Sequence, residues 1–158
     1  MRLDIAPTQG RLDELLERIA DMLALLRSEE KLLSARDAAA LETLTQTKED
    51  LARTINQLSG DLNDDLREQG LPPFPACLET LPRSEASVRQ LASTWQKLAA
   101  LAKQCEQLNE TNGAYIVLLR QHVERCLDIL HERPAENLTY GPDGVAQRPA
   151  ASRRLLSI

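Results

Sequence analysis

The side chains most often used for catalysis or metal binding are few and widely spaced in this sequence. Its two histidines, His122 and His131, are nine positions apart. On a helix this spacing places them on different faces, so they do not form the i, i+4 pair that binds zinc. The paired carboxylates Glu29-Glu30 lie in a charged stretch that we expect to be exposed. These residues predict no metal site, no cofactor and no enzyme.

The three cysteines also lack a functional spacing: Cys77, Cys105 and Cys126 form no CxxC motif. An odd number of cysteines without that motif favours a reducing compartment. Cys105 and Cys126 would be about 30 Å apart along one straight helix, too far for a disulfide within it. The sequence also lacks a P-loop, a GxGxxG motif and a GxSxG motif. We therefore expect the cysteines to be small buried side chains.

Charge and hydropathy narrow the classes of partner. The formal net charge is −5, which argues against nucleic acid as the main partner because phosphate binding needs a basic face. No apolar run approaches the roughly 18 residues of a membrane span, and the start of the chain has no apolar targeting segment. We expect a cytoplasmic protein without direct membrane insertion.

The elements that carry these residues are predicted to be helices. The apolar residues are mostly leucine and alanine, and aromatic residues make up only 3% of the chain. Over residues 8–59 apolar positions recur at alternating spacings of four and three, as in coiled coils. Thr8 is the expected N-cap and Gly60 the expected C-cap. Asp37 is a second N-cap candidate, so this helix either continues unbroken or breaks near 34–37.

A second seam of the same period runs through residues 84–132. Between the two seams, residues 60–83 contain four prolines and cannot form one continuous helix. We expect a short helix that ends at Gly70, followed by Phe74 and Leu78 folding back over one end of the bundle.

The predicted fold class is all-α. We expect an elongated antiparallel helical hairpin or bundle with coiled-coil-like packing over residues 1–133. A short helical segment lies in the connection, and residues 134–158 form a flexible C-terminal tail, because they are rich in proline and glycine and have no sustained periodicity. The apolar faces are wider than two helices can bury, which implies either self-association into a homo-oligomer or a helical partner.

The Asn112-Gly113 dipeptide is a strong turn signal inside the second predicted helix. The seam keeps its register on both sides, so we expect the helix to continue through it. Pairing two antiparallel helices of equal length places the polar interruptions of both seams at similar heights. The predicted polar layer that fixes this register contains Glu30, Asp37, Asn109, Asn112 and Gly113. A partner-contact site and a real break in the helix remain alternatives, and Gly113 is expected to permit close approach of another backbone.

Three stretches resemble the FlgN family of flagellar type III export chaperones. The first helix has Leu33, Asp37, Leu41, Leu44 and "TKEDL" at 47–51. The second contains "NETNGAYIVLLRQHVERCLDIL", which is similar to the family's Asn-x-x-Asn-Gly and following aliphatic helix. The tail contains "TYGPDG" at 139–144, which resembles its Tyr-Gly-x-x-Gly motif. Together these stretches follow the family's order over most of the chain.

The resemblance implies a cytoplasmic chaperone that binds the amphipathic C-terminal helices of hook-filament junction proteins. Such a chaperone prevents their premature association and delivers them to the cytoplasmic domain of the export gate. It implies that Tyr140 docks at the gate. The anchors expected to bind the substrate helix are Ile116, Leu119, Val123, Leu127 and Leu130. The alternatives are a self-associating structural coiled coil and a helical adaptor of another secretion system.

Overall fold

Four helices make up the computed structural model, which describes residues 5–132. They are α1 (Ile5–Ala35), α2 (Ala38–Glu68), α3 (Cys77–Thr80) and α4 (Ala86–Glu132). No strand occurs among the described residues. The predicted all-α bundle is therefore confirmed. The chain divides into two compact units, residues 1–116 and residues 117–158, and α4 contributes to both.

The single helix predicted over residues 8–59 is two helices, because the chain reverses at Arg36 and Asp37. Arg36 adopts a left-handed backbone with a φ of 55°. Asp37 then caps α2, since its carboxylate accepts a hydrogen bond of 3.0 Å from the Ala40 backbone nitrogen. Of the two alternatives for this region, the break is the one observed.

The predicted ends of the first helical stretch also move. α1 begins at Ile5, so Thr8 lies inside the helix and is not its N-cap. Pro7 is tolerated there because backbone N–H groups in the first turn of a helix have no acceptor within the helix, so a residue without an N–H loses no hydrogen bond. Gly60 lies inside α2, which continues to Glu68, and the short helix expected up to Gly70 is its last part.

The end of α2 has a Schellman arrangement. Gly70 has a φ of 71°, a conformation that favours glycine. Its nitrogen donates to the Arg67 carbonyl at 2.9 Å, and the Leu71 nitrogen donates to the Leu66 carbonyl at 2.9 Å. The connection between the long helices therefore starts near Gln69 and not at residue 60 as predicted.

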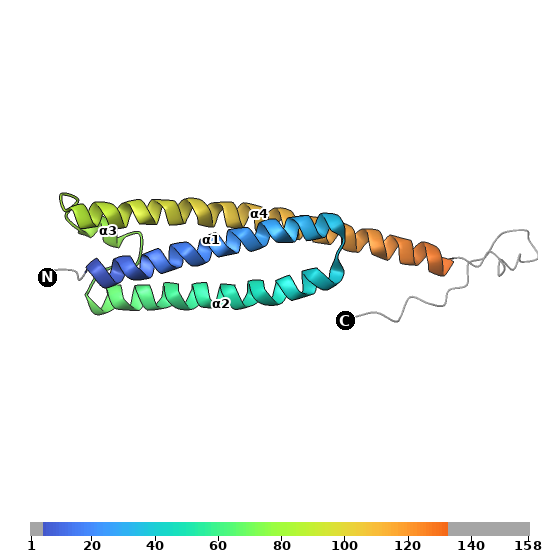
Figure 1. Cartoon of the computed structure of the whole chain (residues 1–158), viewed down its shortest axis with the longest axis horizontal. Helices are drawn as coiled ribbons and strands as arrows, with labels where there is room; N and C mark the ends of the chain where they lie inside the picture. The colour runs from blue at the N-terminus through green and yellow to red at the C-terminus, as the bar shows by residue number, and fades with distance from the viewer. Residues whose placement is uncertain (1–4, 133–158) are drawn as a thin grey trace, which may run out of the picture. The chain divides into compact units, whose positions relative to one another are not determined.

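Within the first unit, α1 and the part of α4 up to residue 116 run in the same direction, and α2 runs in the opposite direction (Figure 1). Side-chain contacts between α1 and α4 confirm the parallel pairing in the first unit, because each links residues about 85 positions apart. Three hydrogen bonds show this: Gln9 donates to Thr94, Cys105 donates to the Ile19 carbonyl, and Asn112 donates to the Leu26 carbonyl. The predicted antiparallel bundle is formed by α2, which runs opposite to α1 and to the first part of α4. The pairing of α1 with α4 is parallel, because the reversal at Arg36 adds one more change of direction.

The core of the first unit lies where α1, α2, α4 and the connection meet. Leu12 and Leu91 are fully buried in it, and Leu62 of α2 is 2% exposed. Phe74 and Leu78 pack against this cluster, as expected for a connection that folds back over the bundle. The Phe74 ring stacks on Trp95 with a centroid distance of 5.1 Å.

Candidate functional site

A buried polar layer lies in the first unit, between α1, α2 and α4. Glu29 of α1 is only 3% exposed. One of its carboxylate oxygens, Oε1, pairs with Lys48 Nζ of α2 at 2.8 Å. The other, Oε2, accepts a hydrogen bond of 2.9 Å from Asn112 Nδ2 of α4. The three helices are thus joined at one carboxylate.

Asn112 completes the layer by binding the backbone as well. Its Nδ2 also donates to the Leu26 carbonyl at 2.9 Å. A buried charge is costly unless it is paired and hydrogen-bonded, and here both oxygens of Glu29 have partners. Lys48 additionally donates to Asn109 Oδ1 at 3.4 Å, on the exposed edge of the layer.

The predicted polar layer is only partly the observed one. Asn112 is buried in it, and Asn109 lies at its edge. Glu30 is exposed, and Asp37 is an exposed N-cap at the turn. Glu29, which we expected to be exposed, is the buried carboxylate. The signal for it is its place three residues after Leu26 and four before Leu33, both buried.

Gly113 lies within α4, so the Asn112-Gly113 dipeptide is helical and not a turn. Gly113 is exposed, and a Cβ built on it meets no atom within 4 Å. The close approach of another backbone that we expected here is absent from the described residues. The buried hydrogen bonds of Asn112 therefore explain the asparagine at this position. No packing contact in the structure explains the neighbouring glycine.

Exposed apolar side chains gather on the last part of α4. Ile116, the last residue of the first unit, is 45% exposed. In the second unit, Leu127 is 46% and Leu130 is 65% exposed, Val123 is exposed and Leu119 is half-buried. These are the five residues predicted to bind a substrate helix, and all occur on one helix at spacings of three and four. The exposed set is wider than the five, since it also includes Tyr115, Val117, Leu118 and Ile129.

Polar residues accompany this apolar segment. Arg120 Nε and Glu124 Oε1 form an exposed ion pair of 3.1 Å one helical turn apart. His122 Nε2 lies 3.7 Å from Cys126 Sγ, and both side chains are exposed. Cys126 is thus not the small buried side chain that we expected. The segment has the pattern of an amphipathic helix surface with a polar border.

The other two cysteines are shielded from solvent to different degrees. Cys77 is fully buried, and burial raises the pKa of its thiol to about 11. Cys105 is half-buried, and burial raises its thiol pKa, partly opposed by the charge of Arg27. Both thiols are therefore protonated at neutral pH, which makes them poor nucleophiles.

Residues 5–132 contain no group of three or more histidine, cysteine or acidic side chains placed to hold a metal ion. Within the same range, every helix is too short or too polar to cross a membrane. The predicted tail, residues 134–158, and its Tyr140 lie outside the described residues.

Comparison with known proteins identifies the family. The profile of the FlgN protein family matches residues 1–148. The flagella synthesis protein FlgN of Yersinia enterocolitica is 28% identical over 155 residues, which cover 95% of this chain and 96% of that protein. No solved structure is significantly similar to the chain. Because the family profile spans nearly the whole sequence, the chain belongs to the FlgN family.

Proposed function

We propose that the chain is a cytoplasmic flagellar export chaperone for hook-filament junction proteins. It binds their amphipathic C-terminal helices, prevents premature association and delivers them to the cytoplasmic domain of the export gate. Membership in the FlgN family supports a role in flagellar assembly. The proposal that the chain binds substrate helices rests on the row of exposed apolar side chains from Ile116 to Leu130.

Exposed aliphatic residues in such density favour a binding role over a structural one. Soluble proteins rarely leave contiguous apolar surface uncovered unless a partner covers it. A helix that binds another helix presents anchors at i, i+3 and i+7, and Ile116, Leu119 and Val123 have this spacing. Burial of such side chains contributes about 25 cal/mol per Å² of apolar surface, without any covalent step.

The alternative is that the same surface pairs with a second copy of the chain. A self-associating coiled coil would use the same stripe on α4 and would be a stable oligomer without any other protein. Light scattering of the purified chain separates the two functions, because the chaperone proposal expects the apolar stripe to remain available for substrate.

We further propose that the polar layer of Glu29, Lys48 and Asn112 fixes the register of the bundle. An apolar layer at this height would tolerate sliding of one helix by a turn. A carboxylate that needs partners from two other helices does not tolerate it, because a slip leaves the charge buried and unpaired. This role is separate from substrate binding.

The direct test of the chaperone proposal is co-purification with the C-terminal helical region of a hook-filament junction protein. We expect a stable complex at micromolar concentrations, and we expect a peptide of the same composition with a scrambled apolar pattern to remain unbound. If the two proteins do not associate at these concentrations, the substrate proposal is wrong.

Tyr140 provides a test of the delivery step. We expect Tyr140→Ala to reduce export of the junction protein strongly while leaving substrate binding within about twofold, since the resemblance assigns this residue to the gate. Export and affinity are measured on the same variant. An equal loss of both would show that Tyr140 does not separate docking from substrate binding.

A further inference from the structure

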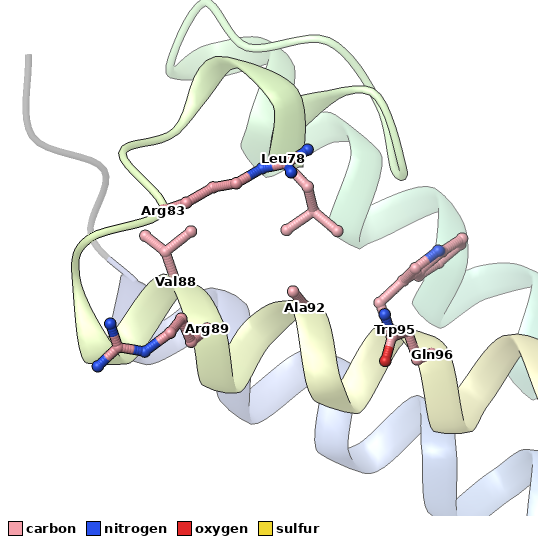
Figure 2. Close-up of a pocket in the computed structure, with 7 residues that line it drawn as sticks. All are labelled: Leu78, Arg83, Val88, Arg89, Ala92, Trp95 and Gln96. Carbon is pink, nitrogen blue, oxygen red and sulfur yellow. The ribbon is translucent and has the colours of Figure 1, made fainter.

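A pocket of about 400 Å³ lies between α3 and the start of α4, within the first unit. Its lining residues from the two helices are mostly apolar, and they are shown in Figure 2. Leu78 of α3 faces Val88 and Ala92 of α4 across the opening, with Trp95 closing one end. The volume is within the range of about 300 to 1,000 Å³ that is typical of binding sites.

The walls of the pocket are held by defined contacts. Trp95 is fixed by its stack on Phe74, at a centroid distance of 5.1 Å. The Leu78 nitrogen donates to the Pro75 carbonyl at 3.0 Å, and Thr80 Oγ1 donates to the Cys77 carbonyl at 2.8 Å. Since Cys77 is fully buried, α3 is anchored to the core. The pocket is therefore largely formed before any ligand arrives, which reduces the entropic cost of binding.

The charged side chains of the pocket are all basic. Arg83 extends over the opening toward Leu78, and Arg89 points away from Trp95 (Figure 2). One Arg89 nitrogen, Nη1, donates to the Ser84 carbonyl at 3.1 Å. No carboxylate lines the pocket.

Neither Arg83 nor Arg89 forms an ion pair within the described residues, as is also true of Arg27, Arg36 and Arg125. The arginines that do pair with a carboxylate within residues 5–132 are Arg11, Arg18, Arg53, Arg67 and Arg120. Arg89 is held by its bond to the Ser84 carbonyl, so Arg83 is the guanidinium available to a ligand. A free guanidinium beside an apolar wall is complementary to a carboxylate that is attached next to an aliphatic group.

We propose that this pocket is a docking site for a peptide segment of a partner protein that places a carboxylate beside an aliphatic side chain. The aliphatic group occupies the space between Leu78, Ala92 and Trp95, and the carboxylate accepts hydrogen bonds from Arg83. This surface lies on the first unit and shares no residue with the proposed substrate stripe. It therefore provides a second interaction that does not depend on the chaperone proposal.

Trp95 gives the experiment a specific signal because it is the sole tryptophan of the chain. The full-length protein is titrated with acetyl-Leu-Glu-Leu-Leu-amide and, as a matched probe, with acetyl-Leu-Gln-Leu-Leu-amide. We expect both peptides to change the emission of Trp95, and the glutamate peptide to reach half-saturation at an about fivefold lower concentration, as for a partly solvated ion pair.

Three variants separate the contributions of the charge and of the apolar space. Arg83→Gln should remove the difference between the peptides, whereas Arg67→Gln, a change of the same charge on an exposed arginine of α2, should preserve it. Ala92→Leu should fill the pocket and abolish the response to both peptides while the helical circular dichroism is unchanged.

Three outcomes overturn the proposal. If both peptides reach half-saturation of the unaltered protein at the same concentration, Arg83 does not bind the carboxylate. An unchanged response in Ala92→Leu places binding elsewhere. Emission that changes when the protein alone is diluted assigns the pocket to a second copy of this chain. None of these measurements uses a junction protein, so their failure is distinct from failure of the chaperone proposal.

Discussion

Replacing Glu29 with alanine is expected to lower the free energy of unfolding by about 2 kcal/mol, because the change leaves Lys48 and Asn112 without their shared acceptor. The cost stays below that of a fully buried ion pair, since the Lys48 side chain is 24% exposed and can reach water. Denaturant unfolding followed by circular dichroism measures the effect.

The adjacent Glu30 is the matched control because it is exposed. Glu30→Ala removes the same charge from the same helix and should change the free energy of unfolding by less than about 0.5 kcal/mol. Replacing Glu29 with leucine and Lys48 with methionine together should restore much of the lost stability, as both charges are then removed. Equal effects of the Glu29 and Glu30 substitutions would show that the polar layer does not stabilise the bundle.

The second large effect concerns the apolar segment of α4. Leu127→Asp is expected to weaken binding of a junction-protein helix by about 3 kcal/mol, or more than 100-fold in Kd, because it removes an apolar anchor and places a carboxylate in the interface. Because Leu127 is 46% exposed in the free chain, the substitution should change the free energy of unfolding of the chain little. Isothermal titration calorimetry with the substrate helix gives the affinity.

Gln121→Asp is the control for charge, because Gln121 is exposed on the same helix and is not one of the five anchors. This variant should bind within about threefold of the unaltered protein. If Gln121→Asp and Leu127→Asp weaken binding equally, general charge repulsion explains the effect, and the assignment of Leu127 as an anchor is wrong.

The helical class and the continuity of α4 were predictable because they follow from local pattern. A seam in one register on both sides of Asn112 is difficult to reconcile with a turn. The reversal at Arg36 was only one of two alternatives, since the spacing of four and three residues continues from α1 into α2 across it. Arginine gives no signal for a positive φ, and only the Asp37 cap marked the break.

The identity of the buried carboxylate could not be predicted from the heptad pattern alone. A helix with one neighbour buries a narrow seam, and that seam selects Glu30. α1 packs against both α2 and α4, so its buried face is wider and includes Leu15 and Glu29 as well. Which of the two adjacent glutamates is buried therefore depends on where the third helix lies. Here α4 runs parallel to α1 and places Asn112 beside Glu29.

The helical state of Asn112-Gly113 also affects how the protein ages chemically. In an unfolded chain, an asparagine followed by glycine deamidates readily, because the glycine nitrogen attacks the side-chain amide carbon to form a succinimide. The backbone of α4 holds that nitrogen away from the amide, and the amide itself is bound to Leu26 and Glu29. Deamidation at Asn112 therefore requires local opening of the helix, and each event would place a new carboxylate against that of Glu29. The rate of deamidation at Asn112 would therefore report how often α4 opens locally at this position.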